Sequence, residues 1–281
     1  MNGTFGYCAA LVRDADHGRY LATLFAPAER RDALFSLYAF DIEISRIRDL
    51  AREPMPGEIR LQWWREVLDG ERAGEANANP VAASLLATLK RYGLPAGPLA
   101  GLVEAHRFDV YDEPLPTISA LQTYAASTAG TIFALAARIL DATAETRAAV
   151  TEAAQARTIA NVLAWLPRHA ARRQLFVPLD MLGLYGADAE DLFAMRATTE
   201  LRAVLAELRL RARRHLGNVA RLSAGLPDSV WPAFLCLAPL RPWLAAMERT
   251  GYQPFRPPVI SPWRRQWSVW RAAKSLARIG G

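Results

Sequence analysis

The stretch Leu37-Tyr-Ala-Phe-Asp-Ile-Glu-Ile-Ser-Arg-Ile-Arg-Asp49 lies in a helical run that the sequence predicts from Pro27 onward. Proline is tolerated at the first position of a helix, because its missing N–H would have no partner there. Asp41, Ser45 and Asp49 are spaced four apart, which places them on one face of the predicted helix. Apolar side chains at helical spacing predict its buried stripe, which consists of Leu34, Leu37, Tyr38, Ile44 and Ile47.

The composition favours a large helical protein. Hydrophobic residues make up 52% of the 281 residues, and runs of β-branched residues are few. Helical patterns follow one another along the chain, so we expect a single all-α domain over residues 1–281. The apolar content is high enough to line a central cavity of lipid size.

Charge and cysteine usage exclude several classes of protein. The formal charge of +6 comes almost entirely from arginine and accompanies no nucleic-acid motif, so no nucleic-acid partner is expected. Cys8 and Cys236 match no metal or disulfide spacing, which indicates a reducing compartment. No run approaches 18 apolar residues, and the first 20 residues have no signal- or transit-peptide features. We therefore expect a cytoplasmic protein that is free or rests on the inner membrane.

A second stretch, residues 161–178, is expected to lie across the cavity from the first. It carries Trp165 and His169 at the same four-residue spacing. The remaining polar and aromatic residues that we expect to line the cavity or contact a ligand are Tyr38, Glu43, Gln62, Arg65, Tyr124, Arg168, Arg172, Arg173 and Gln174.

Three segments resemble the squalene/phytoene synthase family. They are Tyr20-Leu-Ala-Thr-Leu-Phe-Ala-Pro-Ala-Glu-Arg-Arg31, Leu37-Tyr-Ala-Phe40 and Leu175-Phe-Val-Pro-Leu-Asp180. The resemblance implies an all-α isoprenoid synthase fold around a hydrophobic cavity. It also implies, for active members, head-to-head condensation of two prenyl diphosphates by Mg²⁺ held on two aspartate-rich helices. Mg²⁺ prefers carboxylate oxygens, and the bound metal would stabilise the departing pyrophosphate.

The chain departs from the family pattern at both motifs. In the first motif the family's leading aspartate falls at Ser45, while the last is kept as Asp49. In the second motif the two aspartates fall at Trp165 and His169, and a phosphate-contacting arginine becomes Gln174. Three of the four metal-binding carboxylates implied by the resemblance are therefore replaced, and we expect no metal cofactor.

The remaining charges near the motifs allow four interpretations. Asp41 and Asp49 are the ligands expected if Mg²⁺ binds after all. We expect instead that arginines from the second stretch (Arg168, Arg172 and Arg173) form ion pairs with these acids, because a buried unpaired charge is costly. The alternatives are a solvated cavity mouth with no specific role and an anion site made of arginine without metal.

Five further segments resemble one branch of the family, which contains an assembly factor of respiratory complex I. They are residues 26–29, 40–43, 60–64, 167–178 and 231–235. The resemblance implies a non-catalytic role in complex I biogenesis, with membrane subunits or assembly proteins as partners. The alternatives are an active prenyltransferase that uses Mg²⁺ and a carrier that binds an isoprenoid or another lipid.

The predicted last helix, residues 263–278, places Trp263, Trp267 and Trp270 at i, i+4 and i+7 among arginines and Lys274. This pattern is typical of a helix lying on an anionic membrane surface. It also fits a C-terminal helix docked on the core with an ordinary charged outer face. Both interpretations stay open at this level.

Overall fold

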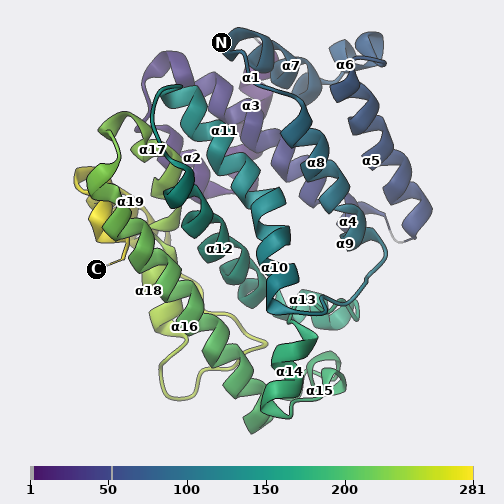
Figure 1. Cartoon of the computed structure of the whole chain (residues 1–281), viewed down its shortest axis with the longest axis vertical. Coiled ribbons are helices and arrows are strands. Elements are labelled where there is room, and N and C mark those ends of the chain that lie inside the picture. Colours follow the sequence, from purple (N-terminus) through teal and green to yellow (C-terminus); the bar gives the residue numbers. More distant parts are fainter. Residues whose placement is uncertain (1–2, 52, 281) are drawn as a thin grey trace. The chain divides into compact units, whose positions relative to one another are not determined.

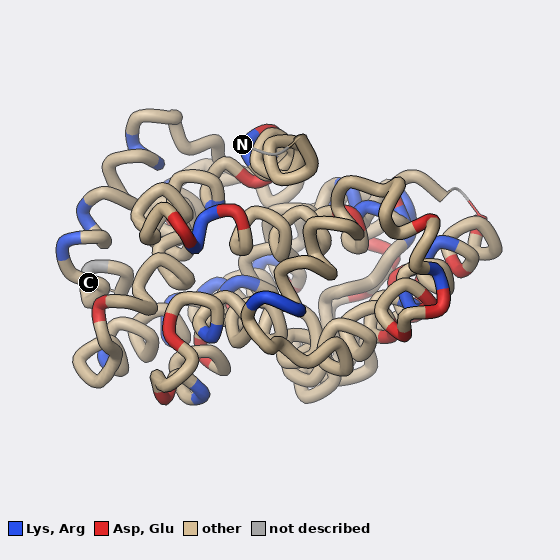
Figure 2. Tube along the Cα trace, turned by 90° about the horizontal axis from the view of Figure 1, so that it is seen from above, with Lys and Arg blue, Asp and Glu red and all other residues tan. Residues whose placement is uncertain are grey.

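The computed structural model describes residues 3–51 and 53–280, and this part of the chain is helical without a strand (Figure 1). The all-α prediction is confirmed. The five apolar residues predicted as the buried stripe of the central helix are all buried. Basic and acidic residues are scattered along a trace that is mostly uncharged (Figure 2). Within the described residues no helix is long and apolar enough to cross a membrane.

The helices have the following bounds. The first part of the chain forms α1 (Gly3–Ala15), α2 (His17–Thr23), α3 (Ala28–Ser45), α4 (Ile47–Leu50), α5 (Pro54–Asp69), α6 (Ala73–Ala78), α7 (Pro80–Tyr92), α8 (Gly97–Ala105) and α9 (Arg107–Val110). The middle forms α10 (Ile118–Ala125), the π-helical turn η1 (Ala126–Gly130), α11 (Thr131–Leu140), α12 (Arg147–Ala164), α13 (Leu166–Ala171), α14 (Leu179–Tyr185), α15 (Ala189–Phe193) and α16 (Thr199–Leu222). The last part forms η2 (Ser223–Gly225), η3 (Asp228–Val230), α17 (Trp231–Phe234), η4 (Leu235–Leu237), α18 (Leu240–Ala246), α19 (Pro262–Lys274) and η5 (Leu276–Ile279).

The chain forms two compact units that interleave in the sequence. Unit 1 consists of Met1–Tyr111, Thr131–Thr146 and Leu226–Cys236, and unit 2 of Asp112–Gly130, Arg147–Gly225 and Leu237–Gly281. The single domain expected from the sequence stays a prediction.

Unit 1 is built around the central helix. α3 packs against α1, α7 and α11, and α5 packs against α8. Ten of the twelve residues of α3 from Ala33 to Ile44 are buried, so this part of the helix is surrounded rather than half-exposed. The surrounding helices bury the hydroxyls of Ser36 and Tyr38, whereas Asp41 and Ser45 of the first motif are half-buried.

Unit 2 is built on the pairing of α12 with α16, and η1 also packs on α12. At Gly130, the end of η1, a Cβ would lie a tight 3.3 Å from the Ala125 carbonyl oxygen and in ordinary contact, at 3.6 Å, with the Cβ of Ala154 of α12. Backbone hydrogen bonds hold the C-terminal end of the second motif region against Leu115. The Leu115 N–H donates to the Leu175 carbonyl at 3.1 Å, and the Leu179 N–H donates to the Leu115 carbonyl at 2.9 Å.

Several predicted boundaries are wrong. The helical pattern predicts a first helix over residues 7–24 and another over 98–111. The structure divides the first at Asp16 into α1 and α2 and the second into α8 and α9. Residues 70–80, whose polar composition predicts a loop, contain α6. The division at Asp16 has the largest consequence, because it aims the start of α2 at the central helix.

Candidate functional site

The turn between α1 and α2 is fixed by Asp16. Its backbone is not helical (φ −137°, ψ 77°), and its carboxylate accepts a hydrogen bond from the Arg19 N–H at 3.0 Å. Aspartate is a favoured N-cap because it satisfies one of the free N–H groups of the first turn. The cap starts α2 anew and thereby directs the Arg19 side chain into unit 1.

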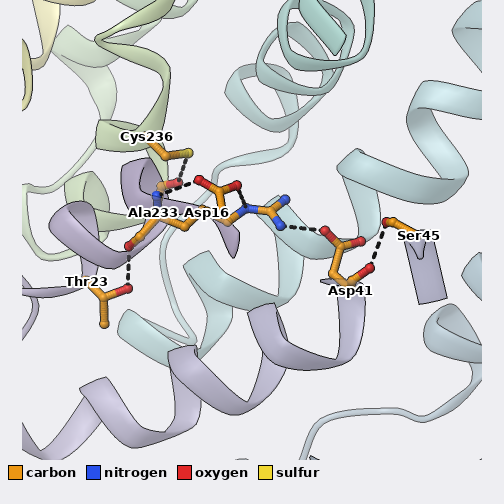
Figure 3. Close-up of polar contacts among 7 residues, drawn as sticks. Asp16, Thr23, Asp41, Ser45, Ala233 and Cys236 are labelled. Atoms are coloured by element: carbon orange, nitrogen blue, oxygen red, sulfur yellow. Dashed lines mark hydrogen bonds and ion pairs between the residues drawn. The ribbon is translucent and has the colours of Figure 1, made fainter. Parts of the chain in front are cut away.

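Arg19 forms a buried ion pair with the first motif. Its Nη1 donates to the Asp41 carboxylate, and the side chains of Arg19 and Asp41 are only 6% and 13% exposed. Its Nε lies 3.8 Å from Asp16, and its guanidinium lies 5.0 Å from the centroid of the Tyr38 ring. Figure 3 shows Asp16 and Asp41 on opposite sides of this group, with Thr23 donating to the Arg19 carbonyl at 2.8 Å.

Burial and neighbouring charges shift the pKa values of Arg19 and Tyr38. Burial alone would lower the pKa of Arg19, but the carboxylates of Asp41 and Asp16 outweigh burial and raise it. Burial raises the pKa of Tyr38, so this hydroxyl stays protonated at neutral pH. Arg19 is therefore a permanent internal cation that neutralises the acid nearest to it on α3.

The three-residue face predicted on the central helix is interrupted. α3 ends at Ser45, whose hydroxyl donates to the Asp41 carbonyl at 2.7 Å, and Asp49 belongs to the separate short helix α4. Serine hydroxyls that bond the preceding turn in this way often accompany bends. The prediction of one continuous helical face through Asp49 is wrong. Glu43 lies beside this face and is half-buried, and burial raises its pKa.

The second motif forms an aromatic cluster made of Trp165, His169, Phe176 and Tyr124. His169 is buried and stacks on Phe176 with ring centroids 4.5 Å apart, and Tyr124 meets Phe176 edge-on at 5.9 Å. Trp165 is 40% exposed, lies edge-on to His169 at 6.2 Å and has the Arg168 guanidinium 5.2 Å above its ring. Aromatic packing therefore occupies the two positions where the family pattern has carboxylates.

The arginines of the second stretch have local partners. Arg173 has a left-handed backbone (φ 57°), forms an ion pair with Glu190 of α15 and lies 4.5 Å from the centroid of the Phe193 ring. The expectation that Arg173 pairs with the acids of the first motif is wrong, and so is the expectation that Asp41 pairs with an arginine of the second stretch. For Arg168 and for the half-buried Arg172 that pairing stays a prediction. Gln174 is 4% exposed and adjoins this turn.

Two residues expected at the cavity lie on the outer face of α5. Gln62 is exposed and donates to Glu66 at 3.0 Å, and Arg65 is exposed and lies 3.3 Å from Glu104 of α8. The buried face of α5 carries Leu61 and Trp64 instead. Whether Gln62 and Arg65 contact a ligand stays a prediction.

The donor groups at the motif positions do not fit Mg²⁺. Nowhere in residues 3–51 and 53–280 do three His, Cys, Asp or Glu side chains come close enough together to hold a metal ion. Asp41 is occupied by Arg19, the Ser45 hydroxyl bonds the backbone, and Trp165 offers no ligand. Mg²⁺ needs several hard oxygen ligands in octahedral geometry. Sequence reasoning missed Arg19, because no local pattern marks the partner of an acid 22 residues away.

The fold places the chain in the isoprenoid-synthase class of all-helical proteins. The crystal structure of squalene synthase HpnC from Alicyclobacillus acidocaldarius aligns with a TM-score of 0.76 and 26% identity, over 90% of this chain and 95% of that one. The model of the squalene/phytoene synthase family matches residues 12–271. This chain belongs to the squalene/phytoene synthase family, as its motifs predicted.

Relatives with two different printed roles are similar to this chain. NADH dehydrogenase (ubiquinone) complex I, assembly factor 6 from Homo sapiens is 29% identical over 258 residues, which are 91% of this chain and 77% of that protein. The 15-cis-phytoene synthase from Synechococcus elongatus is 26% identical over 265 residues, which are 89% of this chain and 86% of that protein. Family membership alone therefore does not choose between a catalytic and a non-catalytic role.

Proposed function

We propose that this chain is a non-catalytic member of the squalene/phytoene synthase family that acts in the biogenesis of respiratory complex I, the NADH:quinone oxidoreductase. The observation that carries the proposal is the buried Arg19–Asp41 ion pair. An internal cation occupies Asp41, which with Asp49 was the acid expected to hold Mg²⁺ if a metal binds, and aromatic side chains occupy the two carboxylate positions of the second motif.

The chemistry of the family explains why these changes matter. Mg²⁺ would bridge facing carboxylates to the two diphosphates and stabilise the leaving group. Ser45, Trp165 and His169 provide no carboxylate for that bridge. Loss of several ligands at once removes the electrostatic part of catalysis, while the helical scaffold is kept. The similarity to the human complex I assembly factor over 91% of the chain suggests what such a scaffold does.

The second candidate function is a prenyltransferase that condenses prenyl diphosphates with Mg²⁺. It is favoured by the similarity to the Synechococcus phytoene synthase and by the retention of Asp49. A carrier of isoprenoid or lipid would keep the cavity without the reaction, and lipid that co-purifies with the protein would identify it.

A deletion strain separates these functions. Under the proposal, deletion lowers NADH:quinone oxidoreductase activity and leaves hopanoid and carotenoid content unchanged. An Asp49→Asn variant should restore the oxidoreductase activity as well as the native chain does, because no metal ligand is needed. Loss of hopanoid or carotenoid alone would overturn the proposal.

A purified-protein assay gives an independent check. The full chain is incubated with farnesyl or geranylgeranyl diphosphate and Mg²⁺, and pyrophosphate release is measured. We expect no release above background. Turnover that Asp49→Ala abolishes would establish the prenyltransferase instead.

A further inference from the structure

The C-terminal helix α19 (Pro262–Lys274) carries three large aromatic side chains on its surface. Trp263, Trp267 and Trp270 are 63%, 51% and 42% exposed. Large aromatic residues normally bury most of their surface, so three neighbouring exposed indoles represent uncovered apolar area. Trp267 and Trp270 stack on each other with centroids 4.9 Å apart, which makes the area continuous.

The direction of these side chains follows from helix geometry. At 3.6 residues per turn, Trp263, Trp267 and Trp270 fall within an arc of about 60°. The buried residues of α19, Val269 and Ala272, fall on the opposite side of the helix. The helix therefore docks on unit 2 through a small apolar face and holds the indoles away from it. We refer to the exposed surface of Trp263, Trp267 and Trp270 as the indole face.

Cations of α19 lie within the indole face and along one side of it. On the same helical projection Lys274 falls within this face, and Arg264 and Arg271 lie together on one side of it, at about 80–100° from Trp263. Lys274 Nζ lies 3.8 Å from the centroid of the Trp270 ring, and the Arg264 guanidinium lies 5.4 Å from that of Trp263. All three cationic side chains are exposed.

The surrounding sequence has one sign of charge. After Glu248 the chain contains no Asp or Glu through residue 281, while arginine and lysine recur throughout that segment. Arg264 and Lys274 are exposed beside the indoles, so these two cations can reach anions in the solvent. The side chain of Arg278, counted with this helix in the sequence pattern, lies outside the described residues.

We propose that α19 docks this protein on an anionic lipid surface, with the indole face at the level of the headgroups and glycerol backbone. Indole rings favour that region because they are apolar with one polar N–H, and flanking Lys and Arg side chains reach lipid phosphates. A surface that is both aromatic and uniformly cationic matches a phosphate-bearing membrane in charge and in polarity. The inference goes beyond the proposed function and does not depend on whether the chain is catalytic.

Co-sedimentation with lipid vesicles tests this docking. The full chain is mixed with vesicles of phosphatidylcholine alone or of phosphatidylcholine with one quarter phosphatidylglycerol. We expect at least tenfold stronger binding to the anionic vesicles, and a blue shift of tryptophan fluorescence on binding. Changing Arg264, Arg271 and Lys274 to Gln should weaken binding about 100-fold, because each cation near an anionic surface contributes roughly fivefold.

The aromatic contribution is tested separately. Changing Trp263, Trp267 and Trp270 to Ala should weaken binding at least tenfold and abolish most of the blue shift. The matched apolar control replaces three exposed residues of unit 1, Leu50, Met55 and Ile59, with Ala. The matched charge control replaces the exposed Arg13, Lys90 and Arg91 with Gln. Both controls should bind as the native chain does.

Two results would overturn the inference. One is vesicle binding that is unchanged in both α19 variants. The other is that the native chain does not bind vesicles and instead forms a dimer, as measured by light scattering, and that the tryptophan changes dissociate this dimer. The indole face would then be a contact between copies. Circular dichroism melting distinguishes these results from misfolding, and we expect unchanged melting because the altered side chains are exposed.

Discussion

Replacing Arg19 with methionine should destabilise the fold severely. The substitution keeps an unbranched apolar side chain of similar length but leaves the Asp41 carboxylate buried without its cation. Removing one partner of a buried ion pair costs about 3–5 kcal/mol, because the remaining charge is desolvated and unpaired. The side chains of Arg19 and Asp41 are 6% and 13% exposed, so little solvent screening reduces this cost. Loss of the cation over the Tyr38 ring adds up to about 1–2 kcal/mol.

Thermal and urea unfolding followed by circular dichroism measure this effect. For a chain of this size the loss of Arg19 corresponds to a fall in Tm of roughly 6–15 °C. A double variant, Arg19→Met with Asp41→Leu, should recover most of the stability, since apolar replacement of both partners is often close to neutral. Stability of Arg19→Met within about 1 kcal/mol of the native chain would refute the reasoning, because Asp41 would then have another source of compensation.

Three further predictions concern other parts of the structure. Burial raises the pKa of the Cys8 thiol to about 11. A thiol reagent at pH 8 should therefore label Cys8 only when the chain unfolds. Rapid labelling of Cys8 in the native chain would contradict this. Burial lowers the pKa of His106, but the Asp109 carboxylate, 2.6 Å from its Nδ1, outweighs burial and the net shift is upward. The His106–Asp109 pair therefore adds stability that is full below the unfolded pKa of about 6.5 and is lost as pH rises through the folded pKa. In urea unfolding, Asp109→Asn should cost more free energy at pH 5.5 than at pH 9. Equal losses at the two pH values would exclude this pairing. Gly280→Ala should lower the free energy of unfolding in urea by about 1–3 kcal/mol, because the added Cβ would lie 2.8 Å from the Gly217 Cα. In the control Gly217→Ala the added Cβ meets no atom within 4 Å. This control should be neutral or stabilising by up to about 1 kcal/mol.

Much of the fold was predictable because helical periodicity is a local property. The apolar stripe predicted for the central helix follows from residues a few positions apart, and the structure buries all five of its members. The errors fall where one side chain ends a helix. Asp16 caps α2 inside a run that was expected to be continuous, and the break after Ser45 separates Asp49 from Asp41.

The partners of the motif residues were much less predictable. Arg19 and Asp41 are 22 residues apart and meet because α2 and α3 pack together in unit 1. Arg173 finds Glu190 because α13 packs against α15. Arginines close to a motif in the chain were natural candidates for its acids, but an ion pair selects the cation that packing brings within reach, not the one nearest in sequence.

The sequence by itself determined that this protein is helical, that it resembles the squalene/phytoene synthase family, and that three of the four carboxylates implied by that resemblance are replaced. Those properties depend on which residues are present and on spacings of three to four positions. The tertiary structure decided what the remaining groups do: Arg19 neutralises Asp41, His169 stacks on Phe176, and the indole face of α19 points away from unit 2. The physical reason is that burial and charge pairing depend on contacts between helices distant in the chain, and such contacts exist only after the helices have packed.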